Sequence, residues 1–484
     1  MSNAENISCE NAATAVRAAC DGRGPCTGCS RCFRVGSAMD IAAGGTVLAT
    51  RWDVAHEGAD TSMGAREGTV TGAGESAGAA ARESTTGQLG IAVDVGTTTV
   101  VARLYDLTTG ACLAAASRPN PQARFGADVI SRIAAVRAGH LGELTALIRN
   151  TVSGMTADLL AAAGCTPSAG AGAVAFTCLC GNTVMEHLFA GVDPTPIGLA
   201  PFTPPYTRDF PCETAALTLA PCVAGYVGGD VVADLLALDV PYTPAAEGPV
   251  LLLDLGTNGE IALGDERGVF ACATAAGPVF EGAQIECGMP TYEGAICGVS
   301  RDATGNLVIE TVGDVPAGKA AGICGSGLVD ALALMLDEGV IDERGRWADR
   351  TLPANERRFA LTPRVYVSQK DVRAFQLAKA AIAAGTQVLL NTAGIAPAQV
   401  ARVFIAGGLG SHLNLISAAL TGLIPPGLLA CTEAVGNTAI EGAALALVNP
   451  DARKALDAIS AGCTYIELSG NRDFDARYVQ AMNF

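Results

Sequence analysis

Two short segments of this chain are best suited to binding a phosphate together with a metal ion. Each consists of an acidic residue followed by glycine and by residues with hydroxyl or amide side chains. Glycine lets the backbone turn where a side chain would clash, so turn amides and hydroxyls can face a phosphate. The carboxylate itself repels phosphate, but it can hold a Mg²⁺ ion or the water molecules around it. The first set is Asp94 with Gly96, Thr97, Thr98 and Thr99, and the second is Asp254 with Gly256, Thr257 and Asn258.

Each set lies in a stretch that predicts two strands joined by a tight turn. Residues 91–106 and 250–263 both begin with an apolar run that ends near the acidic residue, and both continue as a second strand after the turn. A single turn of this kind is common in proteins. Because Asp254 lies 160 residues after Asp94, the two copies indicate an internal duplication, with two phosphate-facing turns across a cleft.

A third segment, 403–411, carries Gly407 and Gly408 after an apolar strand. Together the three segments resemble the superfamily of actin, sugar kinases and heat-shock chaperone ATPases, in whose adenosine motif two glycines let the backbone approach the nucleotide. The resemblance implies an α/β fold of two duplicated ribonuclease H-like lobes, each on a five-stranded mixed sheet. The alternative is three unrelated buried strands that end in glycine turns.

Four cysteines near the N-terminus have a spacing suited to a metal centre. Cys20, Cys26, Cys29 and Cys32 lie on a loop rich in Gly and Pro, and thiolates this close in sequence can converge on one metal. The loop resembles that of plant-type ferredoxins, which implies an iron–sulfur cluster, either 2Fe–2S or 4Fe–4S. Structural zinc is an alternative, since thiolates also hold zinc tetrahedrally. A disulfide framework needs an export signal, and the N-terminal residues show none.

The fourth ligand of the cluster has more than one candidate in this sequence. Thr50 stands where the ferredoxin pattern has its last cysteine, and a hydroxyl is a poor iron ligand beside thiolates. Cys32 is the nearest thiol and lies on the same loop. Cys9 is more distant, and a second chain is a further source. We predict that Cys32 completes the set.

Composition and charge limit the classes of function. The chain has 484 residues, 50% hydrophobic and 16% charged, which is enough apolar material for two or three domains. Its net charge of −17 argues against nucleic acid as a partner. We expect no membrane span and a cytoplasmic protein. We expect the cysteines from Cys112 to Cys463 to be reduced, buried thiols. Cys178 and Cys180 are expected in a strand, and His187 is expected to be a helix residue rather than a metal ligand.

Changes in composition divide the chain into four parts. We expect a Cys-rich iron–sulfur unit over 1–54, a flexible linker over 55–88, a first ATPase lobe over 89–247 and a second over 248–484. The linker would let the Cys-rich unit swing between an electron donor and an acceptor.

Within the lobes, helical spacing and glycine punctuation indicate several elements. They predict helices over 127–137 and 141–163. On the helix that follows Gln369 we expect Lys379 to be exposed. Near the C-terminal end, Gly442 would permit a crossing helix to pack closely against the first lobe.

Further motifs resemble one family within this superfamily. Beside the two Asp-x-Gly-Thr turns, they are Cys180-Gly181-Asn182-Thr183, Pro201-Phe202, Gly277-Pro278, Phe280-Glu281-Gly282, Gly325-Ser326-Gly327, Gln369-Lys370-Asp371 and Ala406-Gly407-Gly408. In this order they resemble the reductive activators of corrinoid proteins, which join an iron–sulfur unit to an actin-like ATPase.

The resemblance implies an activity, cofactors and a set of residues. ATP and Mg²⁺ are the expected cofactors beside the cluster, and Asp94, Asp254 and Glu260 are the expected catalytic residues. The chain would return cobalt(II) to cobalt(I) in a corrinoid protein that carries methyl groups. A reduced ferredoxin or a flavodoxin-like protein would donate the electrons, and the chain would form a homodimer. The further residues implied to bind the nucleotide are Gly325, Ser326, Gln369, Lys370, Gly407 and Gly408.

Two other functions use the same ATPase portion. The chain could activate another low-potential iron–sulfur enzyme, such as a dehydratase, because only the partner differs. It could also be a metabolite kinase of the sugar-kinase type. Such a kinase would have no use for Cys20, Cys26, Cys29 and Cys32, which argues against it.

The ligand set of the cluster gives a first testable prediction. Cys32→Ser should lose or destabilise the cluster, because serine is a poor iron ligand beside thiolates, whereas Cys9→Ser should keep it. Visible absorption and iron content of anaerobically purified protein measure both. The opposite pattern would move the fourth ligand to Cys9, and zinc in place of iron in every form would remove the electron-transfer role.

Overall fold

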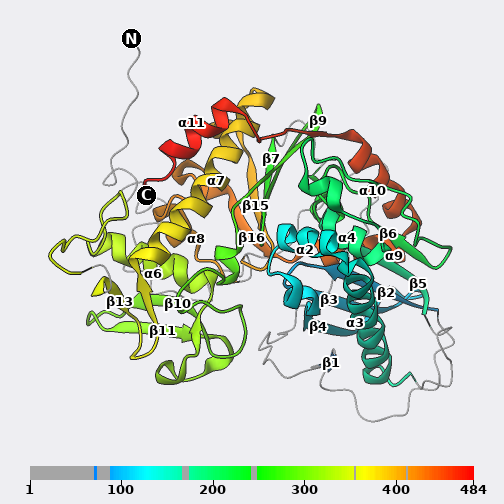
Figure 1. The fold of residues 1–484 in the computed structure, drawn as a ribbon, viewed down its shortest axis with the longest axis horizontal. Coiled ribbons are helices and arrows are strands. Elements are labelled where there is room, and N and C mark those ends of the chain that lie inside the picture. The colour runs from blue at the N-terminus through cyan, green and yellow to red at the C-terminus, as the bar shows by residue number, and fades with distance from the viewer. Residues whose placement is uncertain (1–69, 73–87, 166–173, 241–247, 354–355, 410–411) are drawn as a thin grey trace, which may run out of the picture.

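The computed structural model describes residues 70–72, 88–165, 174–240, 248–353, 356–409 and 412–484. These residues form two lobes that lie side by side, and each lobe is built on one large sheet (Figure 1). The predicted cluster ligands Cys20, Cys26, Cys29 and Cys32 lie outside the described residues.

The sheet of the first lobe combines an antiparallel meander with two parallel strands. In sheet order its strands are β1 (Val70–Gly72), β4 (Cys112–Pro119), β3 (Thr99–Asp106), β2 (Leu89–Val95), β5 (Val174–Gly181) and β6 (Leu217–Leu219). β2, β3 and β4 pair antiparallel, β5 runs parallel to β2, and β6 runs parallel to β5. β2 is buried on both faces, which explains its continuous apolar sequence. β1 lies inside the segment predicted as a linker and pairs with β4.

The sheet of the second lobe repeats this arrangement. In sheet order its strands are β16 (Thr432–Gly436), β15 (Arg402–Ala406), β7 (Val250–Leu255), β8 (Gly259–Asp265), β9 (Gly268–Thr274) and β17 (Cys463–Tyr465). β7, β8 and β9 form the meander, β15 runs parallel to β7, and β16 runs parallel to β15. The order and direction of five strands are repeated, which confirms the predicted duplication, whereas β1 runs antiparallel to β4 and β17 parallel to β9. Each sheet has six strands instead of the expected five, because β1 and β17 extend the same edge of the two meanders.

Helices cover both faces of the first sheet. They are α2 (Val129–Ala135), α3 (Leu141–Ala162), α4 (Thr183–Ala190), α5 (Gly229–Ala237), α9 (Thr438–Val448) and α10 (Pro450–Gly462). α2, α3 and α4 share a core with one face, and a π-helical turn, Val136–His140, joins the two predicted helices α2 and α3. α5, α9 and α10 share a core with the other face and with the second sheet. In Figure 1, α10 lies on the side of the first lobe although it comes late in the chain.

The second lobe adds a long helix and a smaller sheet. The elements are β10 (Ala295–Arg301), β11 (Leu307–Thr311), β12 (Gly322–Ile323), α6 (Gly325–Asp337), β13 (Arg358–Ala360), β14 (Tyr366–Ser368), α7 (Gln369–Ala393), α8 (Leu415–Leu420) and α11 (Arg472–Gln480). α7 covers the outer face of the second sheet, and α11 packs on α7. Short 3₁₀ turns are Pro121–Phe125, Thr195–Gly198, Pro278–Glu281, Val312–Asp314, Ala317–Lys319, Pro397–Gln399 and Pro426–Cys431.

Gly442 determines how closely α9 approaches α5. A Cβ atom at Gly442 would lie 2.0 Å from the carbonyl oxygen of Ala233, a distance that real Cβ atoms do not adopt. α9 also contacts β2 and β5 of the first sheet. The predicted close packing of Gly442 against the first lobe is therefore confirmed.

The prediction that Lys379 is exposed is wrong. Its side chain is buried, its ammonium group donates to the carbonyl oxygen of Asn483, and it lies 5.3 Å from the centroid of the Phe484 ring. Burial lowers the pKa of Lys379 to about 8. The cause is tertiary, because the residues that contact this side chain lie about 100 positions further along the chain, after α11.

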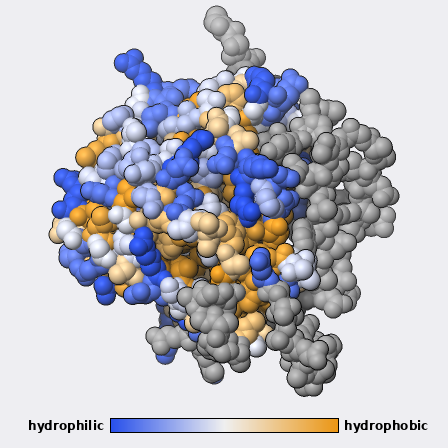
Figure 2. All heavy atoms as spheres, turned by 90° about the vertical axis from the view of Figure 1, so that its right-hand side faces the viewer, coloured by the Kyte–Doolittle hydropathy of each residue, from blue (hydrophilic) through white to orange (hydrophobic). Residues whose placement is uncertain are grey.

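The outer face of the first lobe carries both hydrophobic and hydrophilic side chains. Figure 2 shows hydrophobic residues gathered in the middle and lower part of this face, between hydrophilic ones. The exposed large apolar residues of this lobe include Ile130, Leu199 and Tyr206. In the described ranges, no helix combines the length and apolar character that a membrane crossing requires.

The contact at Gly442 predicts a large effect of one added methyl group. Gly442→Ala should lower the free energy of unfolding by about 1–3 kcal/mol, because the backbone of α5 must move. Gly142→Ala in α3 is the matched control, since a Cβ there meets no atom within 4 Å. Thermal denaturation compares the two. Equal stability of both variants would show that α9 does not depend on the close approach.

Candidate nucleotide site

The two predicted phosphate turns lie in one place, although they belong to different lobes. Asp94 lies near the end of β2 and Asp254 near the end of β7, and each is followed by its turn. The hydroxyl of Thr98 donates to Oε2 of Glu281 at 2.6 Å, and the hydroxyl of Thr257 donates to the same oxygen at 2.7 Å. Glu281 therefore joins the turns across the gap between the lobes.

The carboxylates of the two lobes are close enough to affect each other. Burial raises the pKa of Asp94 to about 6, against the opposing effect of Asn437, whose side-chain amide donates to Asp94 Oδ2 at 2.7 Å. Burial, and then the charges of Asp94 and Glu281, raise the pKa of Asp254 to about 7. The charge on Asp94 is thus disfavoured by low solvation, and the charge on Asp254 by low solvation and by its acidic neighbours.

Helix α5 adds two carboxylates that sequence reasoning did not assign to the site. Burial raises the pKa of Asp230 and of Asp234 well above the usual range, and the charge of Asp254 is the next cause for both. Asp234 accepts a bond from the Thr438 hydroxyl on Oδ1, while its Oδ2 is buried without a hydrogen-bond partner. The sequence signal that could have found Asp230 and Asp234 is their spacing of four residues on a helix just before the second turn, which places them on one helix face.

Glu260, predicted as catalytic, belongs to the same group of acids. It is buried in β8 and pairs with Asp254 across the hairpin. Burial raises its pKa well above the usual range, and the charges of Asp254 and then Asp230 add to this.

This group of acids is chemically suited to a magnesium ion with phosphate. Mg²⁺ prefers oxygen ligands and usually keeps several waters while one or two carboxylates and substrate phosphates complete its shell. No three acidic, histidine or cysteine side chains of the described residues form a closed metal site by themselves. An ion held by Asp94 and Asp254 would therefore need water and phosphate oxygens, which is how Mg²⁺ binds with nucleotides.

The first turn is held in shape by polar side chains of its own lobe. Asn182 donates to the Thr97 hydroxyl at 2.9 Å, and Asn120 donates to the carbonyl oxygen of Gly96 at 2.9 Å. The guanidinium of Arg132 donates to the carbonyl oxygen of Thr97. Arg132 is fully buried, which lowers its pKa to about 10 although the charges of nearby acids oppose this. The turn is thus preorganised by side chains that sequence reasoning did not assign to the site.

The predicted adenosine motif touches the second turn. A Cβ atom at Gly407 would lie 2.4 Å from Oδ1 of Asp254, and Gly407 has a φ of +86°, so only glycine fits there. A Cβ at Gly408 would meet no atom within 4 Å. Gly407 therefore packs on the carboxylate, while Gly408 leaves room for an approaching ligand.

The remaining predicted residues divide into two groups. Gly325 adjoins the adenosine motif, since its Cβ would lie 3.0 Å from Leu409, and Ser326 donates to the carbonyl oxygen of Cys297 at 2.9 Å. Gln369 and Lys370 begin α7 instead. The amide of Gln369 bonds to the loop that precedes β13, and Lys370 is exposed. A nucleotide-binding role for these four residues stays a prediction.

The other residues singled out in the sequence are structural. His187 contacts the Thr183 carbonyl oxygen with Nδ1 and accepts from the Tyr206 amide with Nε2, so neither nitrogen is available to a metal. Cys178 and Cys180 are buried in β5. All twelve cysteines from Cys112 to Cys463 are free thiols, as predicted, but only five of them are buried and the other seven are partly exposed.

The fold and the paired turns define an actin-like ATPase domain. Residues 248–484 match the family model described as the C-terminal domain of RACo, the ASKHA domain, and residues 89–242 match the model of the RACo middle region. The chain is 34% identical over 427 residues to the corrinoid activation enzyme RamQ of Eubacterium limosum, covering 82% of this chain and 70% of that protein. The chain belongs to the family of reductive activators of corrinoid proteins.

Two further relatives agree with this family. A solved structure of a reductive activator for a corrinoid, iron–sulfur protein superimposes with a TM-score of 0.72 at 33% identity, covering 83% of this chain and 67% of that one. A reductase of the Co(II) methylated amine-specific corrinoid protein from Methanosarcina barkeri is 27% identical over 232 residues, 44% of this chain and 41% of that protein.

The buried charge of Asp94 predicts a dependence of stability on pH. A carboxyl group whose pKa is raised by folding stabilises the protein below pH 4, and this contribution is lost as the pH rises through about 6. Asp94→Asn keeps an acceptor for Asn437 but removes the charge. In nucleotide-free protein with magnesium chelated, the variant should therefore be more stable than the wild type at pH 8 by about 1–3 kcal/mol.

The control and the contrary outcome are direct. Asp457→Asn removes the same charge at an exposed position of α10 and should change the free energy of unfolding at pH 8 far less than Asp94→Asn does. Denaturant unfolding at pH 5 and pH 8 measures the effect. A variant of Asp94 that is less stable than the wild type at pH 8 would show that the carboxylate is compensated in the empty site.

Proposed function

We propose that this chain is an ATP-dependent reductive activator that returns the cobalt of a corrinoid protein from cobalt(II) to cobalt(I). The observation that supports it best is the shared acceptor Glu281, which joins a phosphate turn of each lobe. A nucleotide bound there would contact both lobes at once. Membership of the family supplies the corrinoid protein as the partner.

Each part of the site has a role in binding ATP with Mg²⁺. The amides of residues 96–99 and 256–258 would bind the phosphates, and Asp94 and Asp254 would hold the ion. The Thr98 and Thr257 hydroxyls would join them by exchanging Glu281 for a phosphate oxygen. The ion would neutralise charge that develops on the phosphates. Gly408 leaves room for the adenosine side.

The need for ATP follows from the energetics of the electron step. Reduction of cobalt(II) is uphill for ordinary donors, and a tenfold change in a one-electron equilibrium corresponds to about 59 mV. A ligand can shift an equilibrium only by its differential affinity for the two states. Nucleotide binding that alters the relation of the lobes, and so the grip on the corrinoid protein, would supply such a difference.

The electron carrier lies outside the described residues and is part of the proposal. A 2Fe–2S or 4Fe–4S cluster would be held by Cys20, Cys26, Cys29 and Cys32. Reduced ferredoxin or a flavodoxin-like protein would donate electrons to it. The chain would work as a homodimer in the cytoplasm. An activator of another iron–sulfur enzyme would need the same nucleotide site, so the partner has to be tested directly.

The test of this function separates ATP turnover from electron transfer. Asp254→Ala should abolish ATP hydrolysis, because the ion and the second turn lose their carboxylate, while the visible spectrum of the protein stays unchanged. Mixed anaerobically with a reduced donor and a cobalt(II) corrinoid protein, the wild type with ATP should convert the corrinoid spectrum to that of cobalt(I).

Controls make each outcome informative. Asp457→Asn should keep both activities. Full ATP hydrolysis by Asp254→Ala would remove the assignment of the nucleotide site. ATP hydrolysis without any change in the corrinoid spectrum, despite an intact cluster, would favour an activator of a different iron–sulfur enzyme.

A further inference from the structure

A cavity of about 270 Å³ beside the start of α7 is lined by four arginines. Trp347 and Gln369 complete its wall, and we name it the arginine pocket. Three separate segments supply the guanidinium groups: the loop after α6, the segment before β13, and α7 itself. The arginines are Arg346, Arg350, Arg357 and Arg373. None of the lining residues belongs to the phosphate turns or to the adenosine motif, although Gln369 is among the residues that the resemblance implies for the nucleotide.

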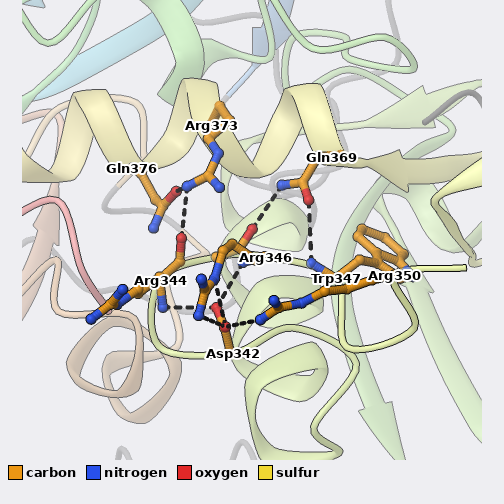
Figure 3. Close-up of polar contacts among 9 residues, drawn as sticks. Asp342, Arg344, Arg346, Trp347, Arg350, Gln369, Arg373 and Gln376 are labelled. Carbon is orange, nitrogen blue, oxygen red and sulfur yellow. Dashed lines mark hydrogen bonds and ion pairs between the residues drawn. The ribbon is translucent and has the colours of Figure 1, made fainter. Parts of the chain in front are cut away.

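One carboxylate serves two of these arginines. Arg346 contacts Asp342 at 2.7 Å, and Arg350 lies 3.9 Å from the same carboxylate. Figure 3 shows the Arg346 and Arg350 side chains gathered around Asp342 below α7. Within the described ranges, these are the ion pairs that the pocket arginines form.

The other two arginines bond to neutral oxygens. Arg373 donates to the carbonyl oxygen of Arg344 at 2.7 Å and to the side-chain oxygen of Gln376. Arg357 donates to backbone carbonyl oxygens, and its charge is a minor cause of the lowered pKa of Asp349, after the bonds from Thr351. Positive charge in the pocket thus exceeds negative charge, in a chain whose net charge is −17.

The loop that carries Arg346 and Arg350 is held firmly against α7. Gln369 donates to the carbonyl oxygen of Gly345 at 2.7 Å and accepts from the Trp347 amide at 3.3 Å. Gly345 has a φ of +65°, and a Cβ there would lie 2.5 Å from the Gln376 side chain. The guanidinium groups are therefore gathered before any ligand arrives, which reduces the ordering cost of binding.

We propose that the arginine pocket binds the phosphate of a small organic phosphate monoester. A terminal phosphate carries up to two charges and presents three acceptor oxygens in different directions, which suits guanidiniums that converge from three segments. A carboxylate offers two oxygens in one plane and a single charge. The cavity exceeds the size of a bare phosphate, which leaves room for an organic part, and the mostly buried Trp347 lines part of its wall.

Trp347 makes the proposal measurable by fluorescence. The chain has two tryptophans, so Trp52→Phe leaves Trp347 as the single reporter. Titration of that full-length variant with glycerol 3-phosphate should give a saturable change in emission. Arg350→Gln, at an exposed position, should weaken the affinity about tenfold or more, because a charge-assisted hydrogen bond is lost. Arg364→Gln, an exposed arginine outside the pocket with the same loss of charge, is the matched control and should bind like the parent.

Each other outcome overturns a stated part of the proposal. No saturable response, or an equal loss in Arg364→Gln, would show that no specific site exists. Citrate acting as well as glycerol 3-phosphate would assign carboxylates as the ligand class. Binding of inorganic phosphate without binding of glycerol 3-phosphate would show that the pocket accepts free phosphate and not a phosphate monoester. Loss of the response in Asp254→Ala would place the ligand in the nucleotide site instead, whereas an unchanged response there supports a separate pocket.

Discussion

The site of this protein depends on one carboxylate oxygen shared by two lobes. Glu281 accepts from Thr98 of the first turn and from Thr257 of the second, through the same Oε2. It is placed by a single 3₁₀ turn, Pro278–Glu281, which follows the second meander and ends in a left-handed glycine, Gly282. Both phosphate turns are therefore hydrogen-bonded to one short segment of the second lobe. These two hydrogen bonds fix the distance between the turns.

Around this acceptor the protein buries more negative charge than it neutralises. Asp94, Asp254, Asp230 and Asp234 raise one another's pKa or have it raised by burial, and Asp234 keeps an oxygen without a partner. Such an arrangement destabilises the empty protein, as functional sites commonly do. The same low dielectric that makes the charges costly strengthens their attraction for a cation.

The acids are also built into the joint between the lobes. Asn437 and Thr438, at the start of α9, bond to Asp94 and Asp234, respectively. α9 then crosses to the first lobe and packs on α5, where Gly442 allows the backbones to approach. A change of charge at the site consequently acts on the helix that connects the lobes, which is the kind of element that hinge motions use.

The sequence by itself determined the local parts of this structure. Both hairpins, the glycines of the adenosine motif and the paired helices before residue 163 depend on short-range patterns, because turns and alternation are decided by neighbouring residues. The duplication was visible for the same reason, as the local pattern of β2 recurs in β7. Motif order was enough to indicate the family. The cysteine ligands near the N-terminus remain a prediction, since they lie outside the described residues.

Tertiary structure alone decided which distant side chains meet. Glu281 was seen in the sequence only as part of a motif, because nothing local shows that two turns 160 residues apart converge on it. Asp230 and Asp234 were missed because an acid on a helix looks like a solvated face until that helix is packed between two sheets. Lys379 was assigned wrongly for the converse reason: Asn483 and Phe484, far along the chain, contact its ammonium group in the folded protein. Charge burial is a property of the assembled chain, since solvation depends on everything packed around a group and not on its neighbours in sequence.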